Sequence, residues 1–215
     1  MASIKLKHTS GNGTILNSPA ANPSSDITLK LPSTTGSAGQ VLKVASANHS
    51  STNAELEFAA GSKVLKIKTV VKTNTYTNGS AGTHDVTGLS LTMDAPASVD
   101  SKYLVIAMLT GTTQNGHSNR FVLNGTTTGT LLQGDAAGSR ARGMAGELFQ
   151  NSSNQAMTQT LVVLDDPDTT ATQTYKVQVV VRSGTGVYVN RSVSDGDATN
   201  ILRSTSTLTV MEIEN

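Results

Sequence analysis

Cysteine is absent from this 215-residue sequence, which excludes disulfide bonds and any thiolate site for a metal or for catalysis. Tryptophan is absent too, and aromatic residues make up only 3% of the chain. Charged residues amount to 14%, and the formal net charge is +1. Because nucleic-acid binding usually needs a basic stripe or face, the sequence predicts no nucleic-acid partner.

Long hydrophobic runs are also missing. No segment approaches the roughly 18 consecutive apolar residues of a membrane-spanning helix. The first five residues lack the apolar run of a signal peptide. We therefore expect a protein without membrane insertion, made in a cytoplasm and either kept there or assembled into something larger.

Serine, threonine, asparagine and glycine occupy much of the sequence instead. Disorder generally goes with a high net charge, which this chain does not have. Threonine and valine suit the half-buried surface of a sheet, so the composition favours an all-β protein. Because large apolar side chains are scarce, we expect part of the stability to come from an interface between subunits.

The first 60 residues contain short segments in which polar and apolar residues alternate. Each segment has few apolar residues on one face, too few to form a core alone. We therefore predict that residues 1–60 form an N-terminal β segment for attachment and oligomerisation, which closes only against copies of itself or against a partner. The alternating segments are residues 3–7, 14–16, 26–31, 40–44 and 54–58.

Residues 63–215 are predicted to form a second domain. Eight strand-like stretches have the spacing expected of a sandwich or barrel, Asn-Gly and Asp-Gly pairs supply turns, and no convincing helix pattern is present. We predict an antiparallel jelly-roll-type β-sandwich. Residues 105–109 are apolar on both faces, so their strand should be central and covered on both sides. The predicted strands are residues 64–71, 89–93, 103–109, 120–123, 160–164, 175–181, 187–190 and 207–213.

Several stretches of this second domain, taken together in order and spacing, carry a family resemblance. They are residues 88–92 leading to 101–105, then 134–140, 164–170 running into 174–178, 187–192 and 206–213. They resemble a domain of tail-fibre and related virion proteins of marine bacteriophages, such as those that infect cyanobacteria. The shorter pattern of residues 29–32 followed by 39–42 is similar to a module common in phage fibre proteins.

The resemblance implies a virion protein, commonly a homotrimer with its C-terminal head turned outward. The chain lacks the shaft repeats of long fibres, so we expect a short tail-fibre or appendage subunit involved in attachment to the host surface. The N-terminal segment would bind tail or capsid proteins, and a host surface polysaccharide is the ligand expected for the head. A capsid decoration or head-fibre protein is the alternative, and a carbohydrate-binding module free of any virion is a third. The expected location is the virion, after synthesis in the cytoplasm of the host bacterium.

Residues of types used in metal binding and catalysis are present but do not form a motif. The histidines lack the close spacing of a zinc site, although one per chain meeting on a trimer axis remains open. The crowded aspartates do not match a calcium-binding loop and are interpreted as turn residues. No nucleophile elbow or phosphate-binding loop is present, so we expect no enzyme, no cofactor and no metal. These residues are His8, His49, His84 and His117, and Asp165, Asp166, Asp168, Asp195 and Asp197.

Four arginines and one tyrosine are the candidates for surface recognition. Arg140, Arg142, Arg191 and Arg203 lie in or beside predicted loops of the head. They fit a receptor surface for an anionic polysaccharide, a set of ion pairs between subunits, or ordinary solvated charge. Tyr76 lies in a polar segment interpreted as a loop, where its ring suits stacking on a sugar. The other three tyrosines lie within strand patterns and are expected in the core or at an interface.

Overall fold

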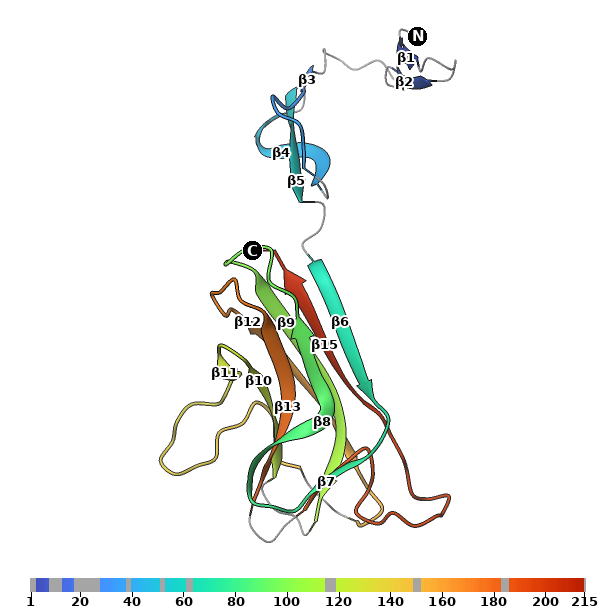
Figure 1. The fold of residues 1–215 in the computed structure, drawn as a ribbon, viewed down its shortest axis with the longest axis vertical. Helices are drawn as coiled ribbons and strands as arrows, with labels where there is room; N and C mark the ends of the chain where they lie inside the picture. Colours follow the sequence, from blue (N-terminus) through green and yellow to red (C-terminus); the bar gives the residue numbers. More distant parts are fainter. Residues whose placement is uncertain are drawn as a thin grey trace. The chain divides into compact units, whose positions relative to one another are not determined.

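The computed structural model describes residues 3–7, 13–17, 28–37, 40–50, 53–60, 64–114, 119–148, 152–182 and 186–214. The chain divides into two compact units, Met1–Gly61 and Ser62–Asn215. Throughout the described residues the regular elements are β-strands, which confirms the prediction of an all-β fold (Figure 1). None of these residues forms a helix long and apolar enough to cross a membrane.

The first unit contains two small sheets. One is an antiparallel pair of β1 (Ser3–Lys7) and β2 (Gly13–Asn17). The other has the order β3-β5-β4, in which β3 (Thr28–Lys30) is parallel and β4 (Gln40–His49) antiparallel to β5 (Asn53–Ala60). Neither sheet has a second layer of strands within the described part of this unit.

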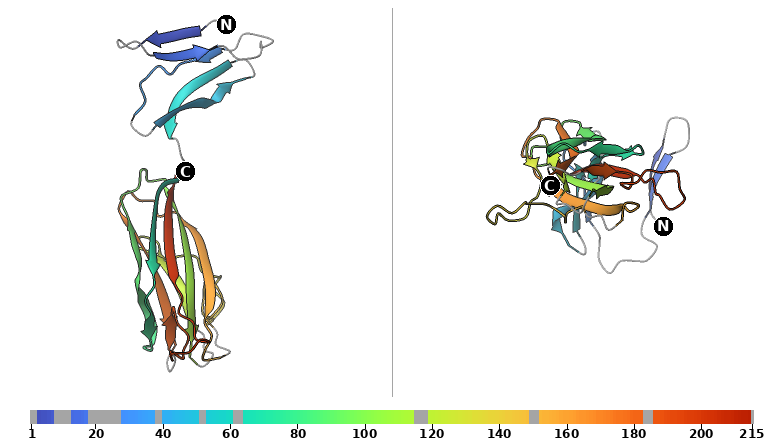
Figure 2. Two further views of the ribbon diagram at one scale, coloured as in Figure 1. Left: turned by 90° about the vertical axis from the view of Figure 1, so that its right-hand side faces the viewer. Right: turned by 90° about the horizontal axis from the view of Figure 1, so that it is seen from below.

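The second unit contains two larger antiparallel sheets that run along its length (Figures 1 and 2). The larger sheet has the order β6-β15-β9-β14-β7, with β12 paired to the other side of β9. The smaller sheet has the order β11-β10-β13-β8. The larger sheet's strands are β6 (Val64–Lys72), β15 (Ser206–Ile213), β9 (Lys102–Thr113), β14 (Val187–Val189), β7 (Tyr76–Asn78) and β12 (Met157–Asp165). The smaller sheet's strands are β11 (Gly129–Thr130), β10 (Arg120–Gly125), β13 (Gln173–Val181) and β8 (Gly82–Met93).

The core of the second unit lies between these two sheets. The core follows from the alternation of buried and half-buried side chains along the strands. Every second side chain is buried along β13, and β15 has the same pattern. A β-strand turns alternate residues to opposite faces, so each strand buries one face against the opposite sheet. The inward residues with the largest fully buried side chains include Tyr103, Tyr175, Phe121, Leu109 and Leu208. This arrangement is the predicted antiparallel sandwich.

Strand β9 departs from one prediction. It is central, since β15 pairs with one side and β12 with the other. Its inward residues Val105 and Ala107 are fully buried, but Leu104 and Ile106 are only half-buried and Met108 is 42% exposed. Within this chain the strand is therefore not covered on both faces as expected: one face packs in the core, and the apolar residues of the other face reach the surface.

Candidate interaction surfaces

The sequence candidates Arg191 and Arg203 meet at one carboxylate. They form an isolated antiparallel bridge after β14. Asp195 accepts an ion pair from each, with Oδ2 3.1 Å from Arg191 Nη1 and Oδ1 2.7 Å from Arg203 Nη2. Arg191 also donates to the carbonyls of Ser192 and Val193 at 3.0 and 2.8 Å, and it lies 5.0 Å from the ring centre of Tyr188. The Arg191 side chain thus holds the loop before β15 in place, and most of its donors are already used.

Asn190, which the sequence analysis did not single out, anchors the start of the same loop. It is fully buried and has a φ of 61°, a left-handed conformation that asparagine tolerates better than most residues. Its Nδ2 donates to the carbonyls of Lys72 and Asn74 at 2.8 and 3.0 Å, and its Oδ1 accepts from Ser206 Oγ at 2.6 Å. One side chain therefore joins β6, β15 and the end of β14.

Lys72 lies beside this anchor at the end of β6. Its side chain is buried and its Nζ donates to Asn74 Oδ1 at 2.7 Å. Burial lowers the pKa of this ammonium from its ordinary value, because the charged form loses solvation. The cation is held inside the sandwich edge and is not presented to a ligand.

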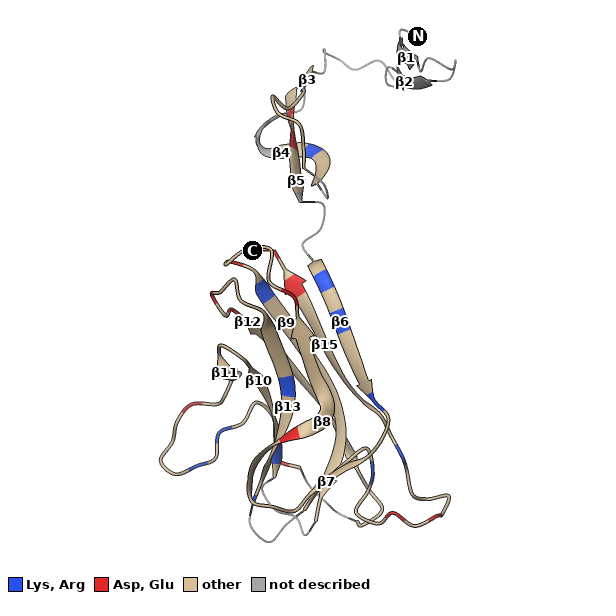
Figure 3. Ribbon diagram, viewed as in Figure 1, with Lys and Arg blue, Asp and Glu red and all other residues tan. Residues whose placement is uncertain are grey.

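Arg140 and Arg142 belong to a different loop, between β11 and β12, and both are exposed. Arg142 Nε donates to the carbonyl of Gly134 at 2.6 Å, and Arg140 Nη1 donates to that of Ala137 at 3.3 Å. Neither has an acidic partner among the ion pairs of the described residues. Figure 3 shows charged positions of both signs scattered over this unit rather than gathered into one patch.

Tyr76 does not lie in a loop, so that part of its prediction is wrong. It begins β7, which pairs with β14, and it packs partly buried against the core. Its hydroxyl accepts from Asn78 Nδ2 at 3.2 Å. The ring supports the sandwich and offers less free surface for stacking than a loop would. The sequence missed the strand because β7 has only three residues.

The candidate metal ligands are not brought together. Nε2 of His84 lies 2.9 Å from the carbonyl of Ser80 in a turn, whereas His8, His117 and the side chain of His49 fall outside the described residues. Asp165 is buried, and Asp166 pairs with Lys102 at 3.2 Å. In the part of the chain that the structure describes, no three His, Cys, Asp or Glu residues are placed to hold a metal ion.

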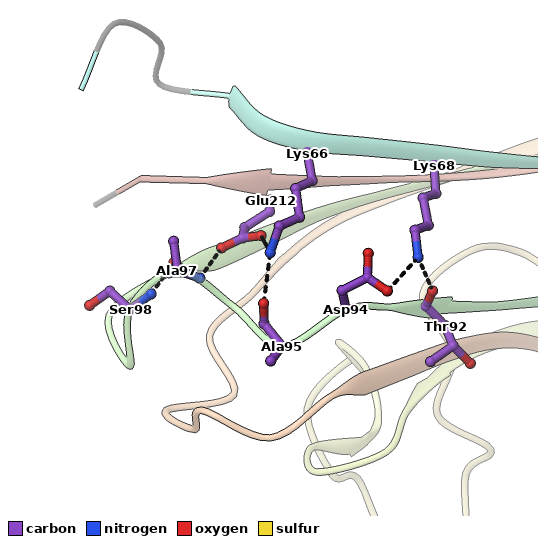
Figure 4. A network of polar contacts seen from close by, with 9 residues as sticks. Lys66, Lys68, Thr92, Asp94, Ala95, Ala97, Ser98 and Glu212 are labelled. Carbon is purple, nitrogen blue, oxygen red and sulfur yellow. Dashed lines mark hydrogen bonds and ion pairs between the residues drawn. The ribbon is translucent and has the colours of Figure 1, made fainter. Parts of the chain in front are cut away.

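A polar clasp closes one open edge of the sandwich (Figure 4). Lys66 on β6 forms an ion pair of 3.0 Å with Glu212 on β15 and donates to the carbonyl of Ala95 at 2.7 Å. Glu212 also accepts from the backbone N–H of Ala97 at 2.6 Å. Lys68 makes a similar pair of 3.0 Å with Asp94. The two lysines therefore fasten β6 to the segment that joins β8 and β9.

The outer surface of the larger sheet is apolar, a feature the sequence analysis did not anticipate. Twelve outward residues on four neighbouring strands define it, eight of them aliphatic or methionine and four of them threonine, and none is buried or charged. We call these twelve residues the outer apolar face. Read across β6, β15, β9 and β12, the rows are Ile67-Met211-Leu104-Leu164, Thr69-Thr209-Ile106-Val162 and Val71-Thr207-Met108-Thr160.

A cavity of about 210 Å³ lies at one end of the second unit. Its lining includes Ser98, Asp100, Ser101 and Glu214. Small-molecule sites usually occupy roughly 300 to 1,000 Å³, so this hollow is small for a substrate.

Comparison with known proteins gives little further information. No family model and no curated protein matches the chain. Among solved structures, the chain matches one of the Gx strain of infectious bursal disease virus (13% identity, TM-score 0.36) and one of a mutant VP2 protein of that virus in T=1 particles (14%, 0.37). A VP2 subviral particle of the same virus is a third (11%, 0.36).

These matches cover 74%, 73% and 74% of this chain but only 39%, 38% and 40% of the viral chains. The chain therefore spans well under half the length of each. With TM-scores this low, the likeness carries no argument about function.

Proposed function

We propose that this chain is a structural component of a bacteriophage virion, a short tail-fibre or appendage subunit that helps the particle attach to its host. The first unit would bind another virion protein, and the second unit would be the outward head. The proposal rests on the resemblance of residues 29–42 and 88–213 to phage fibre proteins and on one structural observation, the exposure of the apolar residues in the first unit.

The first unit leaves its apolar side chains without cover of its own. Among its described side chains, only Ala45 is buried. Val41 and Leu42, neighbours on β4, point to opposite faces of the sheet and are both exposed, so both faces are open. Small sheets need a covered apolar face to be stable. The exposed large apolar side chains are Leu29, Leu31, Val41, Leu42, Val44 and Phe58.

Such a unit is suited to binding a partner chain, because burying these side chains gains the stability that the free unit lacks. A groove of about 390 Å³ between residues 32–37 and β5 adds a concave surface to the same unit. The partner would be a tail protein in an appendage and a capsid protein in a decoration protein. The exposed Arg140 and Arg142 of the head are the residues we propose for contact with an anionic polysaccharide of the host.

Charging the first unit should prevent its incorporation into particles. We expect Val41→Asp combined with Leu42→Asp to lower the copy number per particle at least tenfold, because both faces of the sheet then carry a charge that is costly to bury. Thr28→Asp, at an exposed polar position of the same unit, should leave the copy number per particle within twofold of the wild-type value. Quantitative mass spectrometry of gradient-purified particles measures both. Equal copy numbers for the two variants would contradict attachment through this unit.

A further inference from the structure

Strand β6 has two exposed apolar residues on its outer side, although Val70 packs inward against the core. Lys66, Lys68 and Lys72 point toward the inside of the sandwich, where they meet the contacts described above. Ile67 and Val71, between them, point outward and are 58% and 55% exposed. A strand that packs one face against a core normally does the reverse. This pattern indicates that the outward side of β6 is also buried when the chain is in a complex.

Strand β12, at the opposite edge of the sheet, also has exposed apolar residues on its outer side. Val162 and Leu164 point outward and are 50% and 54% exposed, whereas its inward side carries the core residues Leu161 and Val163 together with Asp165 and Gln159. The outer apolar face therefore extends from one edge strand to the other across the two central strands β15 and β9. Contiguous apolar surface of several hundred square ångströms usually marks a contact site.

The smaller sheet provides an internal comparison. The outward residues of its strands β8 and β13 are polar except for Val180: Ser90 and Thr92 stand opposite Lys176 and Thr174, and Lys176 pairs with Asp85 at 2.9 Å. Hydrogen bonds from Lys176 and Gln178 hold the pKa of the Asp85 carboxyl below its usual value, as expected of a charged group in contact with water and paired on the surface. One outer face of the sandwich is thus polar and the other is apolar.

We propose that the outer apolar face is a self-association surface, covered by the same face of other copies of this chain. The twelve residues carry no charge, so two or three identical faces can meet around a symmetry axis without repulsion. A partner of either charge would find no complementary group there. The inward lysines of β6 disfavour edge-to-edge pairing of strands, which leaves face-to-face packing as the mode of contact.

The size of the sheet's outer surface suits a weak, reversible interface. Strands of eight or nine residues are about 27 Å long, and four neighbouring strands are about 19 Å wide. The whole outer surface of β6, β15, β9 and β12, of which the outer apolar face is a part, is therefore on the order of 500 Å², and pairing two copies removes at most on the order of 1,000 Å² from water. That is the size of weak or transient protein interfaces. The inference does not depend on where, or whether, the chain is placed on a virion.

Single cysteines test the contact directly, because the chain has none of its own. In the full chain, Val162→Cys treated with a short bis-maleimide should give mostly a cross-linked species of twice the 22.2 kDa chain mass, because one cysteine per chain can join only two chains. Ser90→Cys, exposed on the polar face, should remain a single chain at the same concentration. Equal cross-linking of the two variants would overturn the proposal.

Sedimentation equilibrium gives the second measurement. The wild-type chain should sediment as an oligomer, and Val162→Glu combined with Leu164→Glu should dissociate at least a hundredfold more readily, with Ser90→Glu unchanged. Circular dichroism confirms that each variant is folded. A wild-type mass of one chain would overturn the proposal, as would a charged variant with an unchanged mass. If the wild type is monomeric and the charged variant only loses incorporation into particles, the face binds a different protein and the inference fails, while the proposed virion role stands.

Discussion

Replacing Lys66 by methionine should lower the free energy of unfolding by about 3 kcal/mol, because it leaves the Glu212 carboxylate buried without its cation. Glu212 is completely buried, and its Oε2 lies 3.0 Å from Lys66 Nζ. The carboxylate keeps the N–H of Ala97, and one hydrogen bond does not replace its lost solvation. The Lys66 side chain is about one-third exposed, which places the effect at the lower end of the range for broken buried pairs.

Lys68 supplies the matched control, two residues further along the same strand. Its partner Asp94 is 72% exposed at the same 3.0 Å separation, so Lys68→Met should cost less than about 1 kcal/mol. Lys66→Met combined with Glu212→Met should recover most of the loss, since neither charge is then left buried. Urea unfolding followed by circular dichroism measures all three. If the two lysine variants are equally stable, burial of the carboxylate does not set the strength of this clasp.

Replacing Tyr175 by phenylalanine should cost about 2 kcal/mol at neutral pH. Its hydroxyl donates to the buried Asp165 carboxylate at 2.7 Å, and Thr128 Oγ1 supplies the second bond at 2.8 Å. Removing one of two donors leaves a buried charge partly unsatisfied, and hydrogen bonds to charged groups contribute about 1.5 to 3 kcal/mol. The matched control is Tyr188→Phe, whose hydroxyl donates to the amide oxygen of the exposed Gln114 at 3.3 Å, and it should stay within about 0.5 kcal/mol.

The two buried tyrosines Tyr103 and Tyr175 should make the stability of the protein sensitive to alkaline pH. Burial, together with the carboxylate of Glu212, raises the pKa of Tyr103 to about 12, and burial with the bond to Asp165 raises the pKa of Tyr175 further. Unfolded tyrosines ionise at their ordinary pKa near 10. The unfolded state therefore loses protons first, and stability falls as the pH rises from about 10 toward 12.

The variant Tyr175→Phe tests this slope. Each buried tyrosine contributes at most about 1.4 kcal/mol per pH unit in that range. The wild-type free energy of unfolding should therefore fall more steeply than that of Tyr175→Phe, and the difference between them should shrink above pH 10. Denaturant titrations at pH 9, 10 and 11 measure this. Parallel curves would show that Tyr175 does not resist ionisation.

Regular alternation made much of the head predictable. In β13 and β15 apolar residues recur at every second position, and both strands lie where the pattern indicates. Strand β8 was predicted only from residue 89, but it starts at Gly82. Gly88 has a φ of 88° and the register against β13 shifts nearby, so Val86 and Leu89 are both buried although they are three residues apart. A bulge of this kind breaks the period of two on which the prediction depends.

The candidate surfaces were harder to predict, because they depend on contacts between distant residues. Strand β6 alternates regularly, yet alternation does not reveal which face is inside. Its lysines point inward because Glu212 on the neighbouring strand and Asp94 across the sandwich edge provide their partners. The loop position of Arg191 and Arg203 was visible in the sequence, but their shared contact with Asp195 was not. The receptor role of the arginines stays a prediction, as does the trimer.

Labelling particles with gold-tagged antibodies against the head tests the central claim most directly. We expect label at the tail or its appendages of particles purified from cells infected by the phage that encodes this chain. Label spread over the capsid would contradict attachment to the host as the main role and would make the chain a decoration protein. Particles without any label, in preparations where a known virion protein is stained, would contradict a structural role in the virion altogether.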